Sequence, residues 1–107
     1  PSMAVIKSTD ETFEKLKKEN KIFLWRATAD WCMPCKSLSP VLEEISNEMK
    51  GQIVIADQNI DSEPNVPTTM AVKSIPFMAL FKDGKLVSQK VGTHLKANLV
   101  SWIKEHL

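Results

Sequence analysis

The chain has 107 residues, 43% of them hydrophobic and 25% charged, a composition typical of one soluble globular domain with its own core. Fourteen Lys and Arg against thirteen Asp and Glu give a formal charge of +1, and the two signs alternate along the chain, so no nucleic-acid partner is indicated. No apolar run approaches the roughly 18 residues that a membrane span needs, so we expect no membrane partner either.

The chain begins Pro1-Ser2-Met3, without the pattern of a signal peptide. We interpret residues 1–3 as a vector-derived remnant or a disordered N-terminus, and the whole chain, 1–107, as a single domain. The expected location is cytoplasmic. A trimmed leader would leave the same sequence and stays an alternative.

Helical and strand patterns alternate through the first half of the chain. Ser8 to Glu11 fits a capping box, which predicts a first helix as far as Asn20. Apolar runs over 22–25 and 53–56 predict two buried strands. Between them, apolar residues at helical spacing predict a second helix from about Pro34 to Met49, with Pro40 inside it.

The second half of the chain adds a hairpin and two more helices. A polar connection over 61–69 leads to a short helix predicted around 70–72. Asp83-Gly84 separates apolar runs over 77–81 and 86–91, which predicts a β-hairpin. A last helix is predicted to bury one stripe: Leu95, Leu99, Val100, Ile103 and Leu107. These elements predict a three-layer α/β domain whose mostly parallel sheet has an antiparallel edge.

Two cysteines three positions apart carry the candidate chemistry, in Trp31-Cys32-Met33-Pro34-Cys35. A free thiol has a pKa near ~8.5, so a nucleophilic cysteine needs an environment that favours its thiolate. Cys32 is predicted at the N-terminus of the second helix, where unpaired N–H groups and the helix dipole favour negative charge. Pro34 fits an early helical position, and Cys35 lies one turn on as the resolving thiol. This arrangement indicates thiol-disulfide exchange through a mixed disulfide.

A cysteine pair with this spacing also occurs in zinc sites and in purely structural disulfides. Half of a zinc site also has this spacing, but the only other soft ligands are His94 and His106, far from any paired spacing. A purely structural disulfide would close a very short loop and remove little entropy from the unfolded chain. Redox chemistry is therefore the favoured interpretation.

The chain resembles the thioredoxin family over essentially its whole length, from Val5 to Leu107. The landmarks that carry the resemblance are Ala29, Trp31, Cys32, Pro34, Cys35, Lys36, Pro40, Asp61, Ile75-Pro76, Phe81, Gly84 and Val91-Gly92. The resemblance implies a thioredoxin fold, a central mixed sheet of about five strands flanked by about four helices. It also implies a protein-disulfide reductase without a bound cofactor, rereduced by a thioredoxin reductase, with electrons from NADPH. Because no odd cysteine is left over, we expect a monomer.

The resemblance further implies a surface on which partner proteins dock. Pro76 would be cis and lie beside the cysteines, and Ile75 would offer its backbone to an extended substrate segment. We call this surface the docking rim; its members would be Trp31, Met33, Ile60, Ile75, Pro76, Val91 and Gly92. An apolar patch of this kind suits a protein that meets many partner disulfides.

Two departures from the family pattern concern charge and size at the site. Met33 stands where Gly is usual, and it either desolvates Cys32, or widens partner choice, or is merely tolerated on the surface. Arg26 stands where the family keeps a buried Asp that assists proton transfer, and Asp57 stands where it has Lys. A lone buried charge would cost several kcal/mol, so we predict a reversed ion pair of Arg26 with Asp57.

The sequence leaves the role of this reversed pair undecided. Arg cannot serve as a base at any ordinary pH, so Asp57 or water would take over that task. Alternatively, Arg26 stabilises a thiolate, or the pair is structural only.

Two rival functions also stay open. One is a thiol oxidant or isomerase of an oxidising compartment. It is disfavoured by Pro34, where those proteins usually carry His, and by Ile75, but Met33 keeps it open. The other is a binding subunit that uses the same fold to stabilise a partner enzyme, with dispensable thiols.

Overall fold

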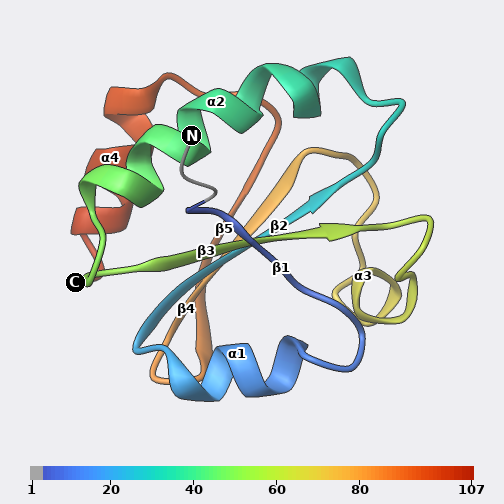
Figure 1. Ribbon diagram of the computed structural model, residues 1–107, viewed down its shortest axis with the longest axis horizontal. Helices are drawn as coiled ribbons and strands as arrows, with labels where there is room; N and C mark the ends of the chain where they lie inside the picture. The colour runs from blue at the N-terminus through green and yellow to red at the C-terminus, as the bar shows by residue number, and fades with distance from the viewer. Residues whose placement is uncertain (1–3) are drawn as a thin grey trace.

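A five-stranded mixed sheet separates two layers of helices (Figure 1). The computed structural model describes residues 4–107, so the remnant or disordered start proposed for residues 1–3 lies outside the described residues. The elements are β1 (Ile6–Lys7), α1 (Phe13–Glu19), β2 (Ile22–Thr28), α2 (Met33–Glu48), β3 (Val54–Asn59), α3 (Asn65–Thr69), β4 (Phe77–Lys82), β5 (Lys85–Val91) and α4 (Lys96–Lys104). The strand order is β1-β3-β2-β4-β5, with β1, β3 and β2 parallel and β4 and β5 antiparallel to their neighbours. The predicted three-layer α/β architecture is confirmed.

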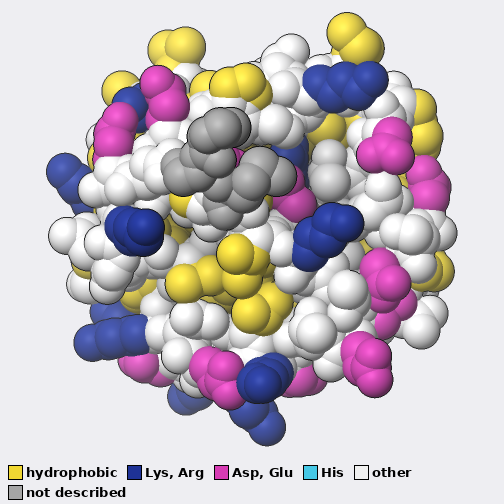
Figure 2. Space-filling model, in the orientation of Figure 1, with side chains coloured by type: hydrophobic (Ala, Val, Ile, Leu, Met, Phe, Trp, Pro, Cys, Tyr) yellow, Lys and Arg dark blue, Asp and Glu magenta, His cyan; other side chains and the backbone are white. Residues whose placement is uncertain are grey.

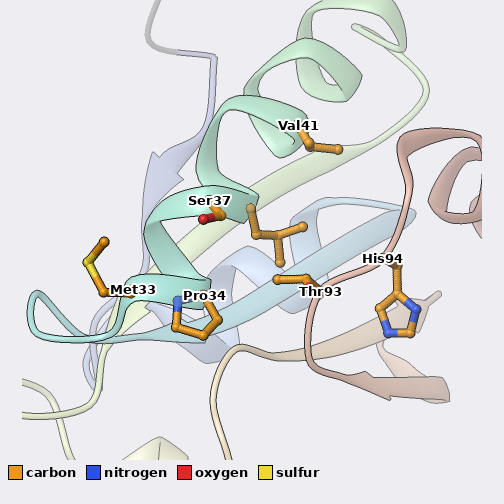
Figure 3. Close-up of a pocket in the computed structure, with 7 residues that line it drawn as sticks. Met33, Pro34, Ser37, Val41, Thr93 and His94 are labelled. Atoms are coloured by element: carbon orange, nitrogen blue, oxygen red, sulfur yellow. The ribbon is translucent and has the colours of Figure 1, made fainter.

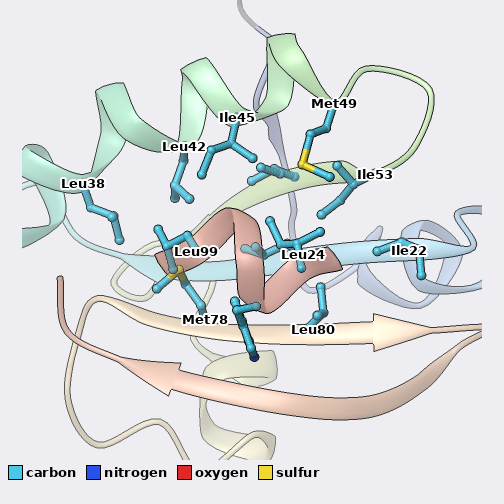
Figure 4. Close-up of a cluster of buried hydrophobic side chains, with 13 residues drawn as sticks. Ile22, Leu24, Leu38, Leu42, Ile45, Met49, Ile53, Met78, Leu80 and Leu99 are labelled. Atoms are coloured by element: carbon cyan, nitrogen blue, oxygen red, sulfur yellow. The ribbon is translucent and has the colours of Figure 1, made fainter. Parts of the chain in front are cut away.

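The central strand β2 is buried on both faces because its side chains alternate between the two layers. Leu24 packs into the cluster formed with α2 and α4, which includes Leu42 and Leu99 (Figure 4). Trp25 packs into the other cluster, where its ring contacts Phe13 of α1 edge-on at 5.7 Å between centroids. The strand is therefore fixed from both sides, and its C-terminal end leads directly to the cysteines.

The predicted start of α1 is wrong. Ser8 is buried, and its hydroxyl donates to the Gln58 side chain at 2.9 Å instead of capping a helix. The helix begins at Phe13, after Thr12. Ser8 follows strand β1, which has only two residues and so leaves no recognisable pattern in the sequence. The pairing of β1 with β3 draws Ser8 into the interior.

The short helix α3 also lies earlier than predicted, at 65–69 instead of around 70–72. The carboxylate of Asp10, from the loop before α1, accepts hydrogen bonds from the backbone N–H groups of Asn65 and Val66. These bonds satisfy first-turn donors and so help to fix where the helix begins. Ala71 has a φ of 56°, a left-handed conformation that a continuing helix would not adopt.

The hairpin turn lies where the sequence predicts it, whereas the last helix is shorter than predicted. Asp83 and Gly84 both have positive φ, 52° and 80°, as a two-residue hairpin turn requires. The predicted stripe of α4 is wrong at both ends: Leu95 is 74% and Leu107 49% exposed, because the helix begins after the first and ends before the second. Trp102 is buried in their place.

The outer surface carries charges of both signs. Lys and Arg side chains lie intermixed with Asp and Glu over the face shown in Figure 2. Within residues 4–107, none of the helices combines the length and the apolar character that crossing a membrane requires.

Candidate active site

Cys32 and Cys35 form a disulfide at the start of α2, with their Cα atoms 5.2 Å apart. Cys32 is the N-cap residue, as predicted, and its sulfur accepts a hydrogen bond from the backbone N–H of Cys35 at 3.2 Å. That N–H belongs to the first helical turn, whose donors have no partner within the helix. Pro34 follows in the same turn, where its missing N–H costs nothing. When the disulfide opens, this geometry favours negative charge on Cys32.

Both cysteines are enclosed by apolar neighbours. Cys32 is 5% and Cys35 1% exposed, and they pack with Ala29, Ile60 and Ile75. The Cys32 sulfur lies 3.8 Å from the carbonyl oxygen of Ile75. A disulfide sulfur carries no hydrogen, so this contact is van der Waals in the oxidised protein, and only the thiol of the reduced protein has a hydrogen to donate there.

The residues of the docking rim surround this enclosed disulfide. Trp31 is 65% exposed, and its indole N–H donates to Asp61 Oδ2 at 2.8 Å, which fixes the ring beside the cysteines. The peptide bond between Ile75 and Pro76 is cis. The N–H of Gly92 donates to the Pro76 carbonyl at 2.8 Å and joins the two loops. Met33 and Val91 are exposed beside them.

An open groove of about 400 Å³ continues the docking rim beyond Gly92. It lies between the first turns of α2 and the loop after β5 (Figure 3). The side chain of Met33 turns away from Thr93 and His94 in this view, so it borders the groove without filling it. A ring nitrogen of His94 lies 3.1 Å from the Val91 carbonyl oxygen. The lining residues are Met33, Pro34, Ser37, Leu38, Val41, Thr93 and His94.

The reversed ion pair lies behind the disulfide. Arg26 and Asp57 are direct neighbours on β2 and β3, so their side chains share the face that α2 covers. Arg26 Nε and Nη2 donate to the two carboxylate oxygens at 2.8 and 2.9 Å. Arg26 Nη1 also donates to the Cys35 carbonyl oxygen at 2.8 Å. Arg26, and not Asp57, therefore contacts the cysteine that was expected to need a base.

Two residues of the site were not predicted from the sequence. Ser39 accepts a hydrogen bond from Arg26 Nη2 at 2.7 Å and donates one to the Cys35 carbonyl at 3.0 Å. Its position four residues after Cys35 on one helical face could have indicated it. Asp61 was noted only as a landmark of the resemblance, and its bond to Trp31 spans 30 positions, which no local pattern reveals.

No group of three or more His, Cys, Asp or Glu side chains in the described part of the chain is placed to hold a metal ion.

Comparison with known proteins agrees with this geometry. The profile of the family described as thioredoxin matches residues 4–105. Similar proteins named thioredoxin include one from Acidithiobacillus ferridurans, 40% identical over 107 residues that cover 99% of both chains. A second is from Rickettsia felis, 39% identical over 100 residues, covering 92% of this chain and 95% of that protein. A third is from Staphylococcus aureus, 38% identical over 105 residues, covering 98% of this chain and all of that protein. The chain therefore belongs to the thioredoxin family, whose members reduce protein disulfides by thiol-disulfide exchange and need no bound cofactor.

Proposed function

We propose that Cys32 is the attacking thiolate and Cys35 the resolving thiol of this protein-disulfide reductase. The observation that carries the assignment is the hydrogen bond from the Cys35 N–H to the Cys32 sulfur at the N-terminus of α2. Cys32 attacks one sulfur of a partner disulfide, and the other leaves as a thiolate that takes a proton from water. Cys35 then attacks Cys32, the mixed disulfide breaks, and the partner leaves fully reduced with the protein oxidised. Pro34 keeps the turn between the cysteines stiff.

We further propose that partner proteins bind on the docking rim. Cys32 is 5% exposed, so a partner sulfur reaches it only when the surrounding surface is closely covered. Trp31, Met33 and Val91 offer apolar surface there, while the half-buried Ile75, joined to Pro76 by a cis peptide bond, offers its backbone to an extended segment.

An Asp in place of Val91 is expected to lower kcat/KM for a protein disulfide such as that of insulin about tenfold. The change removes an apolar contact and adds a charge that binding would have to desolvate, together worth about 1.4 kcal/mol. The matched control is Val87→Asp, since Val87 is 40% and Val91 53% exposed on the same strand, but Val87 is four residues from the rim. Equal losses in the two variants, measured by insulin reduction, would remove Val91 from the binding surface.

Partners and location follow from the same chemistry. The electrons are proposed to come from NADPH through a thioredoxin reductase, and the substrates are proteins with accessible disulfides. A reductant has to be kept reduced, which favours the cytoplasm, where thiols stay reduced. The protein is proposed to act as a monomer, because both cysteines pair within one chain and neither is left for an intermolecular bridge.

The reduction potential tests this proposal against an oxidant or isomerase. We expect a value below about −220 mV, at or below the glutathione pool of the cytosol. It can be measured by equilibrating the protein with graded dithiol buffers and following Trp31 fluorescence. A value near about −180 mV, typical of disulfide isomerases, would replace the reductase proposal with the isomerase one.

A further inference from the structure

The two charges behind the disulfide are buried to different extents. The Arg26 side chain is 1% exposed and the Asp57 side chain 29%. Asp57 lines an open pocket of about 370 Å³, together with Lys7, Asp30 and Asn59. Solvent that enters this pocket would screen the carboxylate, whereas the buried guanidinium has little access to solvent. The pair is neutral as a whole, but it presents its positive end to the interior.

That positive end is fixed against the resolving cysteine. Arg26 Nη1 donates to the Cys35 carbonyl oxygen, and Nη2 donates to Ser39 Oγ, which donates to the same carbonyl. Asp57 holds the guanidinium from the other side through both carboxylate oxygens. Since Arg stays charged at any ordinary pH, the cation is permanent.

Among the described residues, Arg26 is the charged side chain that hydrogen-bonds to Cys35. The hydrophobic residues packed around the two cysteines are Ala29, Ile60 and Ile75. The neighbouring Lys36 on α2 is exposed to solvent. Apolar burial by itself disfavours a thiolate, and a nearby cation favours it. Arg26, held at the Cys35 backbone, is therefore the charged group placed to offset this burial.

We propose that Arg26 is a positioning residue for the resolving step, with its fixed cation stabilising the Cys35 thiolate in place of a buried base. The inference rests on the roles proposed above for Cys32 and Cys35. The Cys35 proton passes to water, and the thiolate attacks Cys32 of the mixed disulfide. The Cys32–Cys35 bond forms, the Cys32–partner bond breaks, and the partner sulfur leaves with the electron pair. Ser39 orients the guanidinium and carries no charge itself.

The effect on rate depends on pH in a way that a structural defect does not. A tenfold larger thiolate fraction raises the rate only about three- to fourfold, because a stabilised thiolate is a weaker nucleophile, with a Brønsted coefficient of about 0.4–0.5. At alkaline pH every thiol is ionised, so the advantage in thiolate fraction is lost and only the weaker nucleophilicity of the stabilised thiolate remains. A cation therefore accelerates the step near pH 7, and its effect falls to zero and then reverses as the pH rises.

The test follows the reduced protein as it reacts with 5,5′-dithiobis(2-nitrobenzoate) in a stopped-flow instrument, with the protein in excess. Attack by Cys32 releases one thionitrobenzoate, and attack by Cys35 releases the second, so the first phase serves as an internal control. Release of only one thionitrobenzoate by the unmodified protein would refute the proposed function itself. The inference about Arg26 is tested on the rate of the second phase alone.

Four variants separate the cation from its alternatives. The neutral double variant Arg26→Met, Asp57→Asn is expected to slow the second phase at least threefold at pH 7, with the difference closing and then reversing toward alkaline pH. Arg26→Lys keeps the charge and should retain the pH profile. Ser39→Ala removes a hydrogen bond that orients the guanidinium but no charge, and should retain the pH profile. Asp57→Asn leaves the cation in place and should not slow the second phase at pH 7.

Three outcomes would overturn the proposal. A neutral double variant with an unchanged rate would show that the cation has no effect. A neutral double variant whose second phase is slowed equally at every pH would show that the pair is structural only. A slower second phase in Asp57→Asn, with its first phase intact, would assign proton transfer to Asp57 instead. If Asp57→Asn fails to fold, Arg26→Lys and the neutral double variant decide the matter.

Discussion

The variant Cys35→Ser is expected to accumulate a stable mixed disulfide with a protein substrate, while Cys32→Ser accumulates none. Cys32 is the N-cap residue of α2, and its sulfur accepts a hydrogen bond from the Cys35 N–H. We therefore expect Cys32 to form the first bond with the partner. Without the Cys35 thiol, that bond has no internal attacker and persists. Both variants should lose more than about a thousandfold in turnover, as enzymes do when a covalent nucleophile is removed. Non-reducing electrophoresis after mixing with insulin, and mass spectrometry of the adduct, measure the difference.

The opposite pattern, with the adduct in Cys32→Ser only, would exchange the two roles. The double variant Cys32→Ser, Cys35→Ser is the control, because it keeps the docking rim but cannot form any disulfide. If this double variant retained the full biological function, the binding-subunit alternative would replace catalysis.

Sequence patterns predicted those parts of the fold that depend on neighbouring residues. The apolar run 22–25 predicted a buried strand, because a strand covered on both faces has no polar alternation. Asp83-Gly84 predicted the hairpin turn, because few other pairs adopt two positive φ angles at low cost. The position of Cys32 at a helix N-terminus followed from Pro34 and the periodicity of α2.

The errors occurred where distant segments meet. Ser8 satisfied a local capping pattern, but its hydroxyl bonds to Gln58, 50 positions away. Gln58 also accepts from the Trp25 indole and donates to Asp10, and Asp10 in turn caps α3. This network links the loop before α1, the central strands and the β3–α3 connection. A capping rule that sees four residues cannot anticipate it.

At the site, too, the sequence predicted one feature and left another undecided. The sequence predicted the ion pair of Arg26 with Asp57 from charge exchange, because a buried charge needs a partner. It left the role of the pair open, because that depends on which charge faces Cys35 and how much water reaches the other. Only the contacts of Arg26 Nη1 and the exposure of Asp57 distinguish a fixed cation from a buried base.

The two halves of this ion pair are expected to differ in what their removal costs. Asp57→Asn leaves a guanidinium that is 1% exposed without a countercharge, and we expect a loss of about 3 kcal/mol in the free energy of unfolding. Arg26→Met leaves a carboxylate that is 29% exposed and regains water, so about 1 kcal/mol is expected. Urea unfolding at pH 7, followed by tryptophan fluorescence, gives both values.

The neutral double variant Arg26→Met, Asp57→Asn provides the control for this difference. It should unfold with a free energy within about 1 kcal/mol of the unmodified protein, because an ion pair replaced as a whole leaves no unpaired charge. Equal losses in the two single variants would mean that water reaches Arg26 as freely as Asp57. The pair would then present no net positive charge to Cys35, so this stability measurement also tests the burial difference from which the role of Arg26 was inferred.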